Sequence, residues 1–195
     1  MLQDRLPDFI RENYYASEWN HASAILIQDF PNEWRDVLDV LAAFRLKKSY
    51  LGAGGNRSPV AIYLDVFLEK RGWKETSFDT KIVVDNVESS TPTHKIDMFK
   101  NGIAFETEWN NKDPFYDRDL NNFRLLHQLQ AVKVGIIVTR ASELQDIFNI
   151  LGRKGSYGNS TTHLAKLVPR LEGGGAGGCP VMVFGIKKSL YREDE

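Results

Sequence analysis

Cysteine is nearly absent from this sequence, and its scarcity excludes two kinds of structure. The 195 residues contain a single cysteine, Cys179. One cysteine cannot form an internal disulfide framework, and it cannot build a cysteine-based zinc site. No histidine is tied to Cys179 by a recognisable pattern, so we interpret it as a structural residue. Any metal that the protein holds is therefore expected to be bound through oxygen.

Long apolar runs and an excess of charge of either sign are also missing. No segment approaches the roughly 18 to 20 uninterrupted apolar residues of a membrane span, and the opening MLQDRLPDFIREN is too polar for a secretory signal. We therefore expect a cytoplasmic protein without a membrane partner. The 25 lysines and arginines nearly balance 26 aspartates and glutamates. Bulk charge gives no support for a nucleic-acid partner, although an acidic metal site can coexist with a local basic surface.

The composition predicts one domain over residues 1–195. A hydrophobic fraction of 42% and a charged fraction of 26% are ordinary for a soluble protein with one substantial core. The sequence shows no repeat and no internal linker. We expect a helical N-terminal part over about residues 1–50 and the catalytic core over about residues 58–187.

Periodicity and turn residues predict alternating helices and strands. The clearest helix has Ser58 as its N-cap and Pro59 at its first position, and it ends at Gly72. Asn32 and Ser142 are predicted to cap two other helices. Helices are expected at 30–48, 58–72, 117–130, 142–151 and 164–171, and strands at 80–87, 102–109, 132–139 and 180–186. This order predicts an α/β fold with a mixed central sheet flanked by helices.

Two glutamates of the strand predicted at 102–109 face the same side. Glu106 and Glu108 are two residues apart in GIAFETEW, so their side chains leave one face of the strand. If that face meets the core, two adjacent ionised carboxylates are costly unless a cation or a raised pKa compensates. Asp97 lies nine positions before Glu106, with the turn signal Lys-Asn-Gly between them. A hairpin would therefore bring a third carboxylate beside the pair.

These residues suit a magnesium site. Mg²⁺ prefers a few hard oxygen ligands together with water and substrate phosphate. The carboxylates of Asp97 and Glu106 and the carbonyl of Thr107 would supply such ligands. Glu108 would then orient or deprotonate the attacking water. The alternative interpretation is the solvated face of an edge strand, with Asp97 in a turn, because acidic alternation alone is a weak signal.

Several segments together resemble one known family, the type II restriction endonucleases of the BglII and BstYI kind. The resemblance rests on Asp97, the step to Glu106, and the segments AFETEWNNK, VGIIVT and SPVAIYLDVFLEKRGWKE. It extends from about Ser58 to the last strand, and the N-terminal third matches poorly. It implies the PD-(D/E)xK nuclease fold, Mg²⁺ with Mn²⁺ as a substitute, and a homodimer. It also implies a prokaryotic enzyme that cuts a short palindromic duplex centred on GATC.

The resemblance assigns roles to individual residues. Asp97 and Glu106 match the metal-binding acids of the family. Glu108 stands where most of the superfamily has lysine and the BglII-like members have glutamine. The identity of the water-activating group therefore stays open, because a glutamate can accept a proton or bind a second metal. Asp65, on the preceding helix, is a candidate for a further acid in the site, and an exposed helical aspartate is the alternative.

Two polar loops beside the site are candidate DNA-reading segments. Asn110, Asn111 and Lys112 follow the acidic strand directly, where the resemblance implies base contacts, since asparagine can pair with adenine and lysine with guanine. The second loop, residues 152–163, offers short polar side chains for base edges and two cations for phosphates. These are Ser156, Asn159, Ser160, Thr161 and His163, together with Arg153 and Lys154. A surface loop rich in turn formers is the alternative.

The sequence therefore predicts a Mg²⁺-dependent, dimeric, sequence-specific DNA endonuclease. Two alternatives stay open. One is a repair or structure-specific nuclease of the same fold, and the other is a DNA-binding module that does not cleave.

Overall fold

Six strands form one mixed sheet in the computed structural model, which describes residues 2–52, 57–158 and 160–194. They are β1 (Tyr14–Trp19), β3 (Lys74–Thr76), β6 (Ile96–Lys100), β7 (Ile103–Glu108), β8 (Val134–Arg140) and β9 (Val181–Ile186). Their order across the sheet is β1-β9-β8-β7-β6-β3. The central strands β7, β8 and β9 are parallel, and β1, β6 and β3 add antiparallel edges.

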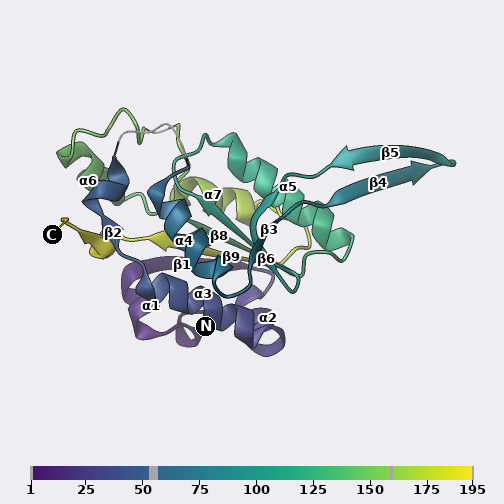
Figure 1. Ribbon diagram of the computed structural model, residues 1–195, viewed down its shortest axis with the longest axis horizontal. Helices are drawn as coiled ribbons and strands as arrows, with labels where there is room; N and C mark the ends of the chain where they lie inside the picture. Colours follow the sequence, from purple (N-terminus) through teal and green to yellow (C-terminus); the bar gives the residue numbers. More distant parts are fainter. Residues whose placement is uncertain (1, 53–56, 159, 195) are drawn as a thin grey trace.

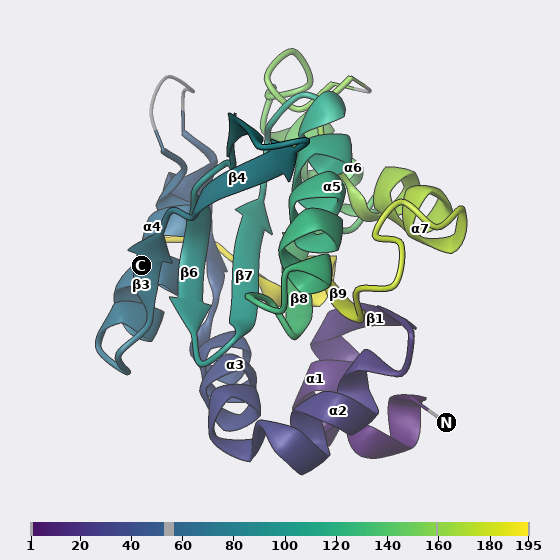
Figure 2. The ribbon, with the colours of Figure 1, turned by 90° about the vertical axis from the view of Figure 1, so that its right-hand side faces the viewer.

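Helices cover both faces of this sheet. They are α1 (Asp8–Asn13), α2 (Ala22–Asp29), α3 (Pro31–Ala43), α4 (Pro59–Glu69), α5 (Pro114–Gln128), α6 (Leu144–Ile150) and α7 (Leu164–Glu172), with short 3₁₀ turns at Leu2–Arg5, Lys48–Leu51 and Lys188–Leu190. One hydrophobic core joins the sheet to α1, α3, α4 and α6, and a second joins it to α5 and α7. Figure 2 shows α5 lying over one face of the central strands. The predicted α/β fold with a mixed sheet between helices is confirmed.

A hairpin stands apart from the central sheet. Strands β4 (Asp79–Val84) and β5 (Val87–Pro92) pair only with each other, and Figure 1 shows them projecting from the body of the protein. The prediction of one strand over 80–87 is wrong, because Asp85 and Asn86 adopt positive φ angles and turn the chain back. Another small sheet pairs β2 (Leu46–Lys47) with β10 (Tyr191–Arg192).

Of the three predicted helix caps, one is confirmed. The Ser58 hydroxyl accepts a hydrogen bond from the Ala61 N–H at 3.1 Å, and Pro59 opens α4. Asn32 does not cap α3, because Pro31 already occupies the first helical position. Ser142 does not cap α6 either, since that helix begins at Leu144 and the Ser142 hydroxyl contacts a histidine instead.

The N-terminal part is less helical than its sequence suggested. Residues 14–19 form β1, which pairs with β9 along its whole length and closes one edge of the sheet. The helix expected over 30–48 ends at Ala43, after which the chain becomes extended. Within the described residues, every helix is too short or too polar to span a bilayer.

A glycine sets the close approach of α5 to the sheet. A Cβ atom added to Gly135 of β8 would lie 2.3 Å from the ring of Phe123. The absence of a side chain at this position therefore lets α5 pack directly on the central strands. This close packing brings the first turns of α5 over the acidic end of β7.

Candidate active site

A tight hairpin brings Asp97 beside Glu106. The turn residues Asn101 and Gly102 have positive φ angles, and β6 pairs with β7 from Lys100 back to Met98. Beyond Met98 the side chain of Asp97 takes the place of a backbone acceptor. Asp97 Oδ2 accepts a hydrogen bond from the Thr107 N–H at 3.1 Å. The Asp97 N–H in turn lies 3.4 Å from Glu106 Oε2. The hairpin that the turn signal predicted therefore holds these two carboxylates in reciprocal contact with the neighbouring strand.

Glu106 and Glu108 lie on one buried face of β7, toward α5. Each is 2% exposed, so the interpretation as a solvated edge-strand face is wrong. Burial raises the pKa of Glu106 well above its usual range, and the charges of Asp119 and Asp97 raise it further. Burial, with a smaller effect from Asp119, also raises the pKa of Glu108 to about 9. Such shifts are typical of carboxylates that lack a compensating cation.

Helix α5 adds two charged residues that the sequence analysis missed. Asp119 is 1% exposed, its Oδ2 atom has no hydrogen-bond partner among the described residues, and burial raises its pKa. Arg118 contacts both Asp119 and Glu108, at 2.7 Å and 3.4 Å respectively. A signal was present in the sequence. Asp119 falls on the same helical face as the apolar residues Tyr116 and Phe123, where a carboxylate is unusual.

Asp65 of α4 belongs to the surroundings of the site. Its side chain is buried, so the alternative of an exposed helical aspartate is wrong. It forms an ion pair with Arg57, and one of its oxygens, Oδ1, has no hydrogen-bond partner among the described residues. Burial raises the pKa of Asp65 to about 7, and the charge of Asp97 adds to the increase. Asp65 therefore lies within electrostatic reach of Asp97.

The two loops that were predicted to read DNA lie against each other. The Thr162 N–H donates to the Asn111 carbonyl at 2.8 Å, and Lys112 forms a β-bridge with Thr161. The Thr162 hydroxyl also lies 3.4 Å from the carbonyl of Glu108. Residues 110–112 and 160–163 therefore form one surface at the end of β7. This surface lies next to the acidic cluster, by which we mean Asp97, Glu106, Glu108 and Asp119.

Some side chains on this surface already have protein partners. Asn111 Nδ2 donates to Glu108 Oε2 at 2.8 Å. The Thr161 hydroxyl donates to the Gly158 carbonyl and accepts from the buried Arg140, both at 2.8 Å. His163 contacts the Ser142 hydroxyl at 3.2 Å.

Other predicted DNA-binding residues are more accessible. Exposed side chains are those of Lys112, Lys154, Ser156 and Ser160, whereas Asn110, Arg153 and His163 are half-buried. Asn159 lies outside the described residues.

The described residues contain no group of three histidine, cysteine, aspartate or glutamate side chains arranged to hold a metal ion. Two carboxylates together with water and substrate oxygens are nevertheless enough for Mg²⁺. Asp97 and Glu106 form such a pair. Asp119 Oδ2 adds a buried oxygen without a hydrogen-bond partner among the described residues, and burial, followed by the charges of Asp119 and Asp97, raises the pKa of Glu106. The donor set therefore fits a divalent cation.

Comparison with known proteins identifies the family of the chain. The family model described as restriction endonuclease BglII/BglIII matches residues 14–186. The match thus begins well before Ser58, where the resemblance in the sequence was expected to start. A solved structure, the crystal structure of free BglII, is similar with a TM-score of 0.58 and 17% identity over 90% of this chain and 79% of that chain. A comparison with curated proteins finds no match.

The structural likeness supports the same fold, and the family match spans most of the sequence, including β1 and every strand of the acidic cluster. The chain therefore belongs to the BglII/BglIII restriction endonuclease family, and it is a type II restriction endonuclease.

Proposed function

We propose that this endonuclease is a Mg²⁺-dependent homodimer that cuts both strands of DNA within a short palindrome. The convergence of Asp97 and Glu106 beside Glu108, on the buried face of β7, carries the proposal. A target centred on GATC and a prokaryotic cytoplasmic setting follow from the family resemblance and form part of the proposal.

Asp97 and Glu106 are the residues that would hold the ion, together with the carbonyl of Thr107. Mn²⁺, which accepts the same oxygen ligands, would substitute for Mg²⁺. When bound, the metal supplies Lewis-acid stabilisation of the charge that develops on the phosphate. Asp65, whose pKa is raised by burial and also by the charge of Asp97, would serve as a further acid.

Glu108 would act on the attacking water. Its pKa of about 9 means that it is protonated at neutral pH in the metal-free protein. Positive charge beside a carboxyl group lowers its pKa. With a cation in the site, Glu108 would therefore lose its proton at a lower pH and become a carboxylate. Glu108 would then orient the water or accept its proton while the water oxygen attacks phosphorus and one phosphorus–oxygen ester bond breaks.

The joined loop surface would read the DNA. The exposed side chains of Lys112 and Ser160 suit base edges, and Arg153 and Lys154 suit phosphates. Asn111 is bound to Glu108 in the free protein. A base contact by Asn111 would therefore change the surroundings of the proposed water-activating group.

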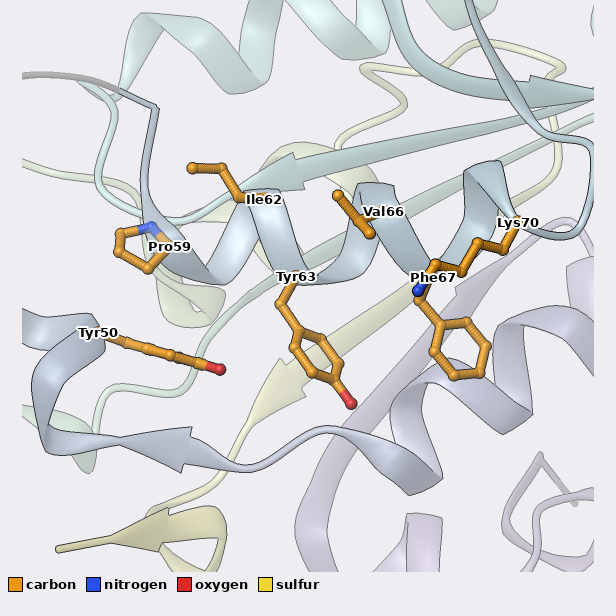
Figure 3. A pocket seen from close by; sticks show the side chains of 7 residues that line it. All are labelled: Tyr50, Pro59, Ile62, Tyr63, Val66, Phe67 and Lys70. Carbon is orange, nitrogen blue, oxygen red and sulfur yellow. The ribbon is translucent and has the colours of Figure 1, made fainter. Parts of the chain in front are cut away.

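The outer face of α4 is the proposed dimer contact. Ile62 and Val66 are 45% and 43% exposed, and Figure 3 shows them along the same helix as Tyr63 and Phe67. These side chains line a groove of about 440 Å³ together with Tyr50, Pro59 and Lys70. A two-fold axis at this face would give one active site to each strand of a palindrome.

Cleavage of plasmid DNA tests the proposal. The purified protein should cut a plasmid panel into discrete fragments in Mg²⁺, and sequencing of the fragment ends should return one short palindrome. Fragments without a common end sequence would instead indicate a repair or structure-specific nuclease. Binding without cleavage in both Mg²⁺ and Mn²⁺ would indicate a DNA-binding module.

Substitution of the metal-binding acids tests the site itself. Asp97→Asn and Glu106→Gln should each abolish cleavage while leaving the circular dichroism spectrum unchanged. DNA binding should persist or strengthen, because repulsion between the acids and the phosphate falls. Asp117→Asn, which changes an exposed carboxylate on the outer side of α5, is the matched control and should cleave normally. Retained cleavage in either active-site variant would refute the assignment.

A further inference from the structure

Arg118 places a positive charge beside Glu108 and Asp119 of the acidic cluster. Its guanidinium contacts Asp119 Oδ1 through Nε at 2.8 Å and through Nη2 at 2.7 Å. Nη2 also lies 3.4 Å from Glu108 Oε1. The two acid side chains are almost fully buried, whereas the Arg118 side chain is 29% exposed. The guanidinium therefore lies between the buried acids and the solvent.

The surroundings fix this guanidinium in one orientation. Its central carbon lies 4.4 Å from the centre of the Phe115 ring, one turn earlier on α5, so the planar group rests on an aromatic face. Asp119 holds the Nε edge. Nη1 has no hydrogen bond within the described part of the chain, so donors remain available for an incoming anion.

The balance of charge shows why such a donor matters. Four carboxyl groups come together here: Asp97 of β6, Glu106 and Glu108 of β7, and Asp119 of α5. Among the described residues, no lysine or arginine other than Arg118 forms an ion pair with Asp97, Glu106 or Glu108. A phosphodiester that approaches this cluster meets like charge, and its charge concentrates further in the transition state. A fixed guanidinium is suited to phosphate oxygens.

We propose that Arg118 is a further catalytic residue, which binds a non-bridging oxygen of the scissile phosphate, and that Asp119 is a positioning residue that holds it. This inference rests on the proposed function, since it names the group that receives the substrate of the same site. On phosphate binding, the weak 3.4 Å contact with Glu108 gives way and the contacts with Asp119 remain. Glu108 is thereby released for its role with water.

DNA binding tests the phosphate contact without any cleavage. Affinity for a duplex is measured against salt concentration in Ca²⁺, for the wild type and for Arg118→Ala. Each phosphate contact contributes a slope of about 0.9 in log Kd against log salt, so the variant should lose about one unit of slope. Arg124→Ala, an exposed arginine one and a half turns further along α5, is the matched control and should keep the wild-type slope.

Single-turnover cleavage in Mg²⁺ tests the catalytic role. Arg118→Ala should reduce the rate by about 10²-fold or more, as expected for removal of one preorganised donor to a developing charge. Arg118→Lys should retain an intermediate rate, because it keeps a charge but loses the planar fork. Millimolar guanidinium should restore part of the activity of Arg118→Ala. Asp119→Asn should also slow cleavage, but added guanidinium should not rescue it, because its own guanidinium is still present.

The outcomes separate this inference from the proposed function. If the wild type does not cleave, the proposed function fails, and the salt slope on random-sequence duplex still decides whether Arg118 contacts phosphate. An unchanged slope, or Arg118→Ala cleavage within about threefold of the wild type, would overturn the inference. The inference would also be overturned if Arg118→Ala cleaves slowly, is not rescued by guanidinium and has a lowered melting temperature. That result would show that Arg118 only supports the structure. If Arg118→Ala does not fold, Arg118→Lys with wild-type slope and rate would also contradict it.

Discussion

At the residue scale, the largest electrostatic cost in the candidate active site comes from three buried acids. Glu106, Glu108 and Asp119 are each at most 2% exposed, and burial raises the pKa of every one of them. The contacts between Asp119 and Arg118 offset only part of that cost. The cluster is therefore unfavourable in the free protein and becomes favourable when positive charge arrives, as expected for a site that binds a cation and substrate.

The pKa of Glu108 gives a prediction for the metal-free protein. The folded carboxyl group keeps its proton up to about pH 9, whereas the usual glutamate value is 4.5. Between these values the folded state binds more protons than the unfolded state, so the free energy of unfolding falls as pH rises. Glu108→Gln removes this pH-dependent contribution to the free energy of unfolding. In EDTA, its melting temperature should decline less than that of the wild type between pH 5 and pH 8.

The size of the effect makes it measurable by calorimetry. A gain of 1 kcal/mol corresponds to about 2–4 °C for a domain of this size, so Glu108→Gln should melt at least that much higher than the wild type at pH 8. The exposed Glu75→Gln, which loses only a surface ion pair with Lys95, is the control. Identical pH profiles for the wild type and Glu108→Gln would show that Glu108 titrates normally in the folded protein.

At the element scale, local signals predicted some elements and failed for others. The helix at Ser58 was predictable because its N-cap and first-turn proline are local signals, although it ends at Glu69, three residues before Gly72 turns the chain. The strand at 132–139 was predictable because burial on both faces demands a continuous apolar run. The strand β1 was missed because YYASEW has little alternation, and its pairing with β9 is a long-range contact.

The candidate site was predictable to a similar extent. The two-residue spacing of Glu106 and Glu108 fixes their common face, and the Lys-Asn-Gly turn fixes the hairpin that brings Asp97 to them. Arg118 and Asp119 come from a helix that packs on the sheet through Gly135 and Phe123. No spacing along the chain encodes that contact. The helical pattern marks Asp119 as a buried carboxylate, but only the tertiary packing shows that Asp119 and Arg118 reach the acids of β7.

The joined loop surface gives a prediction at this scale. Arg140 is buried at the end of β8, donates to Thr161, and lies near the rings of Phe148 and Tyr157. Arg140→Met should loosen the described residues 153–158 and 160–163, so their amide hydrogen exchange should increase and specific DNA binding should weaken. Global stability need not fall, because an apolar side chain can replace a buried charge without loss.

Local exchange, rather than melting temperature, is therefore the decisive measurement for Arg140→Met. Lys154→Ala, in the same loop but exposed, is the control and should leave amide exchange unchanged. Exchange in Arg140→Met equal to that of the wild type would show that the loop is ordered without this contact.

At the scale of the whole molecule, one chain presents one acidic cluster, but a palindrome has two strands to cut. The outer face of α4 is the contact that we propose between two chains. Asp65 of this helix is buried and its pKa is raised in part by the charge of Asp97, whereas Ile62 and Val66 are exposed. A dimer formed through α4 would therefore have its interface on the same helix as Asp65. Such an arrangement couples assembly to the position of the acids.

Ile62→Glu tests this assembly, because it places a charge at the centre of an apolar contact. We expect the wild type to sediment as a dimer on its DNA and the variant as a monomer. Double-strand cleavage should fall by at least about tenfold, which corresponds to about 1.4 kcal/mol of lost association free energy at limiting protein concentration. Ile150→Glu, at a side chain of α6 that is 83% exposed, is the matched control for added charge and should stay dimeric. A dimeric Ile62→Glu would move the interface away from α4, and a wild type that remains monomeric on its DNA would refute the dimer itself.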